Sequence, residues 1–356
     1  MAFKIALLLA FGFQLAAAIL ALRLNVRYRI YSAWFFVSAS AVVAAILRLT
    51  TLCETWTTPP DIEGNWVQWA SAFVSLVASV LLLAGMSVIE PFFKQMAQAQ
   101  ETLRNEHKQL ESIVKETEEE LRLAQRIQRR LLPSTVPNLP HMEVYGQSNP
   151  AVWTSGDYFD YLTLRDGSTA IVVADVSGHG LGPALLMSST RASFRGIAPT
   201  TSDVGELLTN GNLAVADSVS DREFVTAMAV QFDYQQRTLT YAGAGHAGYL
   251  LRADGSSEML PSDAPPLGIL TDLTICASTR TEIMPGDILL LVTDGILETC
   301  NESGEMFGES SLTATVSAHR TASAEKIVHA LLSAAQEFSG QQPQQDDITA
   351  VVVKFL

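Results

Sequence analysis

The N-terminal quarter of the chain is patterned as three uncharged, mostly apolar stretches. They cover residues 5–22, 30–47 and 66–89, with lengths of 18, 18 and 24 residues. A helix needs about 20 apolar residues to cross the hydrocarbon core of a bilayer. The pattern therefore predicts a three-helix transmembrane region over residues 1–94. A signal peptide is the alternative for the first stretch, but the basic residues that follow it favour an uncleaved anchor.

The charges of the two short connections predict how these helices are oriented. Arg23, Arg27 and Arg29 make the first connection basic, whereas residues 53–65 are acidic. Cytoplasmic loops carry an excess of Lys and Arg, so the first connection and everything after Lys94 are expected in the cytoplasm. We therefore expect a multi-pass protein of the bacterial cytoplasmic membrane, with a cytoplasmic C-terminal region.

Residues 95–132 lack Gly and Pro and are rich in Glu, Gln, Lys, Arg and Leu. A seven-residue repeat runs through Met96, Leu103, Leu110, Thr117, Ala124 and Leu131. The second apolar position of each heptad is poorly kept, so the predicted coiled coil is imperfect. Pro133 is expected to end the helix. The pattern predicts a helical linker that forms a homodimer through residues 96–132, with a solvated spacer helix as the alternative.

Residues 133–356 alternate short apolar runs with turn-forming residues. The predicted strands are 169–176, 225–232, 238–242, 248–252, 273–282, 288–293 and 348–355. The predicted helices are 183–196, 204–218 and 324–339. Strands outnumber helices and several are joined by short turns, which favours antiparallel sheets with flanking helices. We expect residues 133–356 to form one layered α+β domain.

Charge and cysteine content narrow the function of this domain. The chain has a net charge of −14, and residues 133–356 alone carry −16. So acidic a domain repels nucleic acid, which excludes it as a partner. The three cysteines, Cys53, Cys276 and Cys300, are far apart, which excludes a disulfide framework and a thiolate zinc site.

Acidic residues lie at the ends of three of the most apolar predicted strands. They are Asp175, Asp294 and the neighbouring pair Asp346 and Asp347. A further aspartate, Asp157, follows Ser155-Gly156. A carboxylate at the end of a buried strand is costly unless its charge is compensated. A turn-forming Asp-Gly pair explains any one of these positions. Carboxylates converging on hard divalent cations explain the whole set better.

The motifs around these aspartates occur in a characteristic order. They read Ser-Gly-Asp-Tyr-Phe-Asp at 155–160, Asp-Val-Ser-Gly-His-Gly at 175–180, Ala-Gly-His at 244–246, Pro-Leu-Gly at 266–268, Thr-Asp-Gly-Ile-Leu-Glu at 293–298 and Gln-Gln-Asp-Asp-Ile-Thr at 344–349. The set resembles the PPM (protein phosphatase 2C-like) superfamily of metal-dependent serine/threonine phosphatases, in its bacterial sporulation protein E and RsbU-like branch. The segment Ala-Gln-Arg-Ile-Gln-Arg-Arg-Leu-Leu-Pro at 124–133 resembles the linker that leads into such domains.

The resemblance implies a fold of two stacked antiparallel β-sheets flanked by helices and a centre of two Mn²⁺ or Mg²⁺ ions. The implied ligands are Asp157, Asp175, the backbone carbonyl of Val176, Asp294 and Asp346, with Asp347 as a further candidate. Asp175 would bridge both ions, and Asp160 would be a supporting or structural residue. The first motif begins with Ser155 where the family usually has glycine.

The implied chemistry needs no nucleophile from the protein. Two divalent ions share a water, lower its pKa and offset charge on the phosphoryl oxygens. His179 could protonate the leaving oxygen or be structural, and His246 is expected to be structural. The implied substrate is a phosphoserine or phosphothreonine protein such as a STAS-type anti-sigma-factor antagonist. A membrane receptor that only binds a phosphoprotein and a small-molecule phosphatase are the alternatives.

Overall fold

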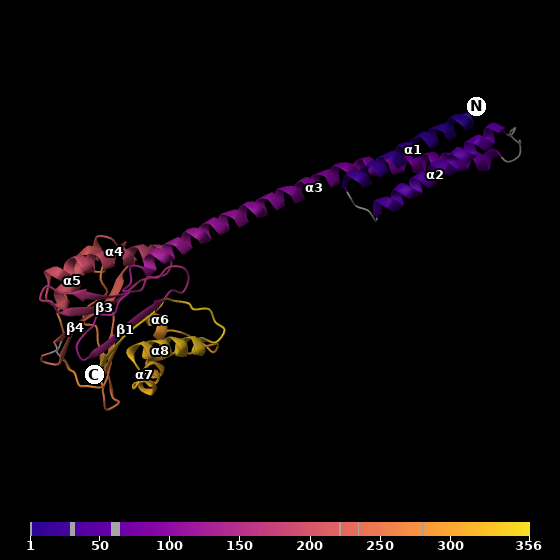
Figure 1. The fold of residues 1–356 in the computed structure, drawn as a ribbon. Helices are drawn as coiled ribbons and strands as arrows, with labels where there is room; N and C mark the ends of the chain where they lie inside the picture. The colour runs from indigo at the N-terminus through magenta and orange to yellow at the C-terminus, as the bar shows by residue number, and fades with distance from the viewer. Residues whose placement is uncertain (1, 29–32, 58–64, 221, 234, 279–280) are drawn as a thin grey trace. The chain divides into compact units, whose positions relative to one another are not determined.

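The chain folds into two compact units, Met1–Lys115 and Glu116–Leu356. The structure is a computed structural model that describes residues 2–28, 33–57, 65–220, 222–233, 235–278 and 281–356 (Figure 1). The boundary between the units falls inside one long helix, α3 (Asn65–Arg129). The C-terminal unit therefore contains the last turns of α3 in addition to the domain that the sequence predicts from residue 133.

Small side chains form the contact between the first two helices of the N-terminal unit. α1 (Ala2–Tyr28) and α2 (Ala33–Thr57) pack against each other. Ala10, Ala17 and Ala41 are almost completely buried in this contact region. Alanine favours the helix and occupies little space, so the two backbones can approach closely.

The prediction that residues 5–22, 30–47 and 66–89 span a membrane is wrong. These residues are helical wherever the structure describes them. Within the described ranges, however, no helix combines the length and the sustained apolar character that a bilayer crossing requires. The predicted location, a multi-pass protein of the bacterial cytoplasmic membrane, is therefore also wrong. Arg29 and residues 58–64, which entered the predicted orientation, lie outside the described residues.

The central part of α3 is exposed along its length, whereas its last turns are not. Residues 94–117 are exposed on every side of the single chain. The apolar heptad positions Leu103 and Leu110 are 67% and 60% exposed. From residue 121 one face of the helix becomes half-buried, and Gln128 is buried. The homodimer through residues 96–132 stays a prediction.

Two five-stranded antiparallel sheets form the centre of the C-terminal unit. One sheet has the order β2 (Tyr158–Thr163), β3 (Thr169–Val176), β4 (Val225–Asp233), β5 (Thr238–Ala244) and β8 (Thr281–Glu282). The other has the order β1 (Met142–Asn149), β10 (Ile348–Phe355), β9 (Ile288–Val292), β6 (Gly248–Leu251) and β7 (Ser257–Leu260). Their neighbouring strands all pair antiparallel.

Helices cover the outer face of each sheet (Figure 1). The first sheet carries α4 (Leu181–Ile197), the short 3₁₀ helix η1 (Ala198–Thr200) and α5 (Val204–Ala216). The second carries α6 (Asp294–Leu297), α7 (Gly308–Ala318) and α8 (Ala324–Ser339). A third apolar cluster fills the space between the sheets. The predicted α+β fold of two stacked antiparallel sheets flanked by helices is confirmed for this unit.

Most predicted elements of this unit match the structure closely, and one does not. The strands at 169–176 and 348–355 and the helix at 324–339 have the predicted bounds. The predicted strand at 273–282 is strand only at Thr281–Glu282 among its described residues, and 279–280 lie outside them. β1, β2, β7, α6 and α7 were not predicted.

Candidate active site

Four of the predicted aspartates meet where the two sheets end on the same side of the sandwich. Asp157 directly precedes β2, and Asp175 lies near the end of β3. Asp294 is the first residue of α6, directly after β9 and Thr293, and Asp346 lies in the loop before β10. The charges of the other three aspartates all act on the carboxyl group of Asp175. Each sheet therefore contributes two carboxylates to one cluster, centred on Asp175.

Burial and mutual repulsion make this cluster costly when it is fully ionised. Burial raises the pKa of Asp175 to about 9, helped by the negative charges of Asp157, Asp294 and Asp346. Burial also raises the pKa of Asp157 to about 7 and that of Asp294 above its ordinary value. A bound cation would reverse the effect, because it favours the charged form of each carboxylate.

Asp157 is hydrogen-bonded at one oxygen and not at the other. Its Oδ2 accepts a hydrogen bond of 2.8 Å from the Thr293 hydroxyl. Its Oδ1 is buried and makes no hydrogen bond of good geometry with the described residues, although the Thr349 hydroxyl and the Asp175 carboxyl group are close enough to lower its pKa. Buried polar atoms almost always have a hydrogen-bond partner. An oxygen left in this state suits a hard divalent cation, which binds carboxylate oxygen.

Asp346 and Asp347 differ sharply in their surroundings. Asp347 is buried, with Oδ1 accepting from Ala151 N at 2.8 Å and Oδ2 accepting from Gly156 N at 2.7 Å. Its two oxygens thus fasten the loop before β2 to the start of β10. Asp346 is exposed, and its charge acts on both Asp175 and Asp294. Asp346 therefore faces the cluster, while Asp347 supports its frame.

Two glycines beside the aspartates allow a close approach of the backbone. A side chain at Gly295 would collide with the backbone carbonyl of Asp347. A Cβ at Gly156 would lie 2.9 Å from the backbone carbonyl oxygen of Val176, the predicted backbone ligand. Both close contacts explain why glycine adjoins an aspartate here, at Gly156-Asp157 and Asp294-Gly295.

The other sequence-predicted residues lie apart from this cluster or serve the core. Asp160 is fully buried and paired with Arg195, with Arg195 Nε to Asp160 Oδ2 at 2.6 Å. His246 is buried beside Thr226, and burial lowers its pKa to about 4, so the ring is neutral. His179 is exposed in the turn between β3 and α4.

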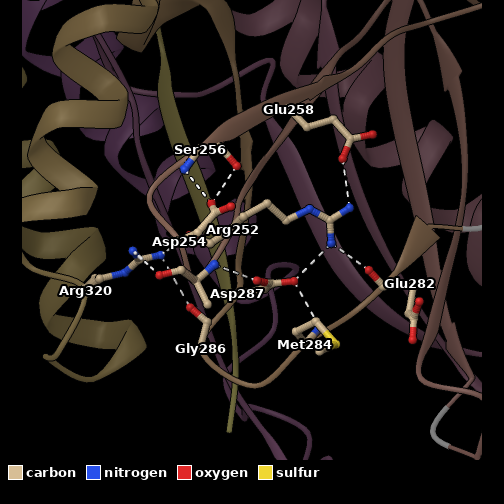
Figure 2. A network of polar contacts seen from close by, with 10 residues as sticks. Arg252, Asp254, Ser256, Glu258, Glu282, Met284, Gly286, Asp287 and Arg320 are labelled. Atoms are coloured by element: carbon tan, nitrogen blue, oxygen red, sulfur yellow. Dashed lines mark hydrogen bonds and ion pairs between the residues drawn. The ribbon is translucent and has the colours of Figure 1, made fainter.

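Asp287 is an equally buried aspartate outside the cluster, and its oxygens are fully engaged. Oδ1 accepts from Ala253 N at 2.8 Å. Oδ2 accepts from Met284 N at 3.0 Å and from the Arg252 guanidinium at 3.1 Å. Figure 2 shows Asp287 enclosed by these donors. It illustrates how a structural carboxylate of this chain is satisfied.

Sequence reasoning missed the contact between the end of α3 and the loop before β2. Gln128 Nε2 donates to Ser155 O at 2.6 Å, and Ser155 N donates to Gln128 Oε1 at 2.9 Å. One helical turn or two earlier, the Arg122 guanidinium lies 5.4 Å from the centre of the Trp153 ring. The only sequence signal for this contact was the motif at 124–133.

The carboxylates form an open cluster rather than a closed coordination shell. Across the part of the chain that the structure describes, no three His, Cys, Asp or Glu side chains are arranged to hold a metal ion on their own. The donor chemistry nevertheless fits Mn²⁺ or Mg²⁺, since the set consists of carboxylate oxygens and includes Oδ1 of Asp157, which makes no hydrogen bond of good geometry with the described residues.

A polar groove of about 690 Å³ begins at this cluster. Of the four clustered aspartates, Asp346 lines the groove, next to Gly295, and the groove extends from there along α8. Neutral amides and hydroxyls dominate its lining, among them Gln147, Asn149, Ser333, Gln336, Gln342 and Gln344. The groove has the volume of a typical ligand site but offers mainly hydrogen-bonding groups.

A sequence profile of the stage II sporulation protein E (SpoIIE) family matches residues 165–356, more than half of the chain. The chain belongs to this family. The matched range contains Asp175, Asp294 and Asp346 but begins after Asp157. It also begins after Gln128, so the end of α3 lies outside the matched range.

Individual relatives of this SpoIIE-family chain are phosphatases. It is 28% identical over 251 residues to the phosphoserine phosphatase RsbU of Bacillus subtilis (strain 168). This alignment covers 70% of this chain and 74% of RsbU. It is 28% identical over 188 residues to the phosphoserine phosphatase RsbP of the same organism, covering 51% of this chain and 46% of RsbP.

Solved structures agree with this assignment. The SiaA-PP2C domain of Pseudomonas aeruginosa superposes with a TM-score of 0.62 at 25% identity, covering 68% of this chain and 99% of that domain. The PP2C phosphatase domain of SpoIIE from Bacillus subtilis, solved with a fragment of its regulatory domain, has the same fold, with a TM-score of 0.53 at 18% identity and coverage of 60% and 63%. The predicted enzyme class, a serine/threonine protein phosphatase, is confirmed.

Proposed function

We propose that the C-terminal unit hydrolyses a phosphoserine or phosphothreonine protein with the help of two Mn²⁺ or Mg²⁺ ions. The observation that carries the proposal is the gathering of three further carboxylates around the buried Asp175. Burial, together with these neighbouring negative charges, raises the pKa of Asp175 to about 9. Such a cluster is unfavourable without cations. Membership of a phosphatase family agrees with a cation site that serves phosphoryl transfer.

The ligands we propose come from both sheets. Asp175 would bridge the two ions. Asp157 and the backbone carbonyl of Val176 would serve one of them, and Asp294 and Asp346 would serve the other. Asp347 would act through the backbone, since both of its oxygens accept N–H groups.

The residues of the chain orient and protect this centre. When bound, ions of this type supply an acidified water and offset charge on the phosphoryl oxygens. Thr293 holds Oδ2 of Asp157, so Oδ1 would be the oxygen that binds an ion. Asp347 fixes the loop that carries Asp157. These contacts fix the position of Asp157 before substrate arrives, which lowers the cost of organising the site.

The polar groove favours a protein substrate over a free small molecule. A polypeptide segment presents amide N–H and C=O groups on either side of the phosphorylated residue. The groove offers complementary amides and hydroxyls next to Asp346 and Gly295. The relatives RsbU and RsbP are named phosphoserine phosphatases. From the family resemblance we propose a STAS-type anti-sigma-factor antagonist as the substrate.

We further propose that the chain forms a homodimer through residues 96–132. The exposed apolar positions Leu103 and Leu110 support a seam in the part of α3 that precedes the docked turns. A Leu110→Cys variant is expected to form a disulfide-linked dimer under mild oxidation. A variant that remains monomeric under the same conditions would contradict the seam.

Phosphate release from a synthetic phosphoserine peptide tests the proposed reaction. The full chain should release phosphate with Mn²⁺ and stop when EDTA is added in excess. Asp175→Asn should be inactive under the same conditions. Hydrolysis that persists in EDTA, or that survives the substitution, would contradict the metal-dependent reaction.

A further inference from the structure

The end of α3 contacts the loop that carries Asp157, and both segments precede the range that the family profile matches. The carboxamide of Gln128 makes two hydrogen bonds with the backbone of Ser155, at 2.6 and 2.9 Å. We call this pair of hydrogen bonds the Gln128 clamp. Gln128 is 7% exposed and Ser155 is 3% exposed, so water is largely excluded from both groups. Without Gln128 the N–H and C=O of Ser155 would be buried without these partners.

The clamped residue is two positions away from a proposed ligand. The Ser155 hydroxyl accepts from Asp157 N at 3.0 Å, and Gly156 N donates to Asp347 Oδ2. Every backbone N–H from 155 to 157 therefore donates a hydrogen bond to a side chain. The acceptors are Gln128, Asp347 and the Ser155 hydroxyl, in that order along the chain. Of these fastenings, only the Gln128 clamp comes from α3.

The last turns of α3 are themselves fixed to the C-terminal unit. Leu132, just after the helix, packs against both the core under α4 and the core between the sheets. The Arg122 guanidinium lies over the Trp153 ring at 5.4 Å, and Trp153 belongs to the same loop. The helix end thus grips the loop at two places, and a displacement of the helix would displace the loop with it.

We infer that Gln128 is a positioning residue that holds the Ser155–Asp157 backbone in the geometry needed for divalent-cation binding. The inference rests on the proposed function, since it assumes that Asp157 binds a cation. Groups that orient a metal ligand typically contribute 10–100-fold to metal affinity or activity. The same range is expected here, because the clamp fixes the backbone from which Asp157 projects.

Calorimetric titration of the full chain with Mn²⁺ alone tests the inference. Gln128→Met keeps the length, packing and helix propensity of the side chain but removes both hydrogen bonds. We expect its Mn²⁺ dissociation constant to rise by about 10–100-fold. The matched control is Gln125→Met, a half-buried glutamine on the same face of α3. That control should bind Mn²⁺ as the wild type does.

A kinetic split separates positioning from general damage. With p-nitrophenyl phosphate, Gln128→Met should need more Mn²⁺ for half-maximal activity, and its KM for the phosphate ester at saturating Mn²⁺ should be unchanged. Unchanged Mn²⁺ affinity in Gln128→Met, or an equal loss in Gln125→Met, would overturn the inference. Absence of Mn²⁺ binding in the wild type would instead overturn the proposed function, and this inference with it.

A second substitution covers the case in which Gln128→Met does not fold. Arg122 is mostly exposed, so Arg122→Gln should fold normally. Loss of an exposed cation–π contact corresponds to roughly a two- to fivefold change in the equilibrium constant for docking of the loop on α3. We expect a rise of that size in the Mn²⁺ dissociation constant. An unchanged constant in Arg122→Gln would then overturn the inference.

Discussion

Asp157 and Asp287 are equally buried, yet their surroundings are opposite. Each is 1% exposed. Asp287 receives donors at both oxygens, including the Arg252 guanidinium (Figure 2). Asp157 receives one hydroxyl, has an Oδ1 without a hydrogen bond of good geometry to the described residues, and lies next to other carboxylates. A buried carboxylate that is hydrogen-bonded and ion-paired within the chain is structural. A buried carboxylate that lacks such partners indicates a bound ligand.

The largest effect should separate the two kinds of aspartate by activity. Asp175→Asn removes the carboxylate that would bridge both ions and is expected to lower kcat by at least roughly 10²–10³-fold. Phosphate release from a phosphoserine peptide at saturating Mn²⁺ measures this. Asp287→Asn is the control and should keep near-normal activity per folded molecule. Equal losses of kcat in both variants would contradict the distinction between a cation-binding and a structural aspartate.

Stability should respond in the opposite sense. Asp287→Asn leaves Arg252 without its buried charge partner and is expected to cost about 2–3 kcal/mol in the free energy of unfolding. Asp175→Asn replaces a buried carboxyl group that has to take up a proton on folding, so the metal-free variant should be at least as stable as the wild type. Urea unfolding in EDTA measures both. A marked destabilisation by Asp175→Asn would contradict the repulsive character of the cluster.

The pH dependence of stability should also differ between the two kinds of site. The pKa values of Asp157 and Asp175 are raised to about 7 and about 9, so the folded metal-free protein holds protons that the unfolded chain has lost. Stability in EDTA should therefore fall as pH rises from about 5 to 8, by about 1.4 kcal/mol per pH unit for each group that is protonated only in the folded state.

Urea unfolding at pH 5.5 and pH 8 checks this dependence. Asp175→Asn should flatten it, and saturating Mg²⁺ should reduce it in the wild type. The Asp287→Asn variant should retain the wild-type slope. A slope that neither Mg²⁺ nor Asp175→Asn changes would place the responsible groups outside the cluster.

The smallest effect concerns the groove rather than the carboxylates. Ser333 lines the groove on α8, and a bulky side chain there should obstruct a protein substrate. Ser333→Trp is expected to raise KM for a phosphoserine protein by about tenfold. A tenfold change corresponds to about 1.4 kcal/mol of binding free energy. KM for p-nitrophenyl phosphate should not change. Glu337→Trp on the same helix is the matched control. An equal rise in KM for Glu337→Trp would show that the groove does not bind the substrate.

The sequence predicted those parts of the fold that local pattern determines. β3 and β10 are nearly continuous runs of β-branched and small apolar residues, and their bounds were found. β2 was missed because it carries Asp160, whose charge is compensated by Arg195 on α4. That partner lies 35 residues away, so no local pattern reveals it. α7 was missed because its serines and threonines weaken the apolar periodicity.

The site was predictable to the same extent. Apolar strands that end in aspartate indicated Asp175 and Asp294 without a structure. The different surroundings of Asp346 and Asp347 depend on how β10 lies beside the loop at 151–156, a long-range relation. The contact of Gln128 with Ser155 also joins distant segments. The membrane prediction was wrong because uncharged length alone was taken as sufficient for a span.

Calorimetric titration of the EDTA-stripped full chain with Mn²⁺ shows directly whether the aspartate cluster binds cations. We expect two ions per chain for the wild type and for Asp287→Asn. We expect strongly weakened binding for Asp175→Asn, because that variant lacks the carboxylate at the centre of the cluster. No binding to the wild type, or unchanged binding to Asp175→Asn, would contradict a cation site built on these aspartates.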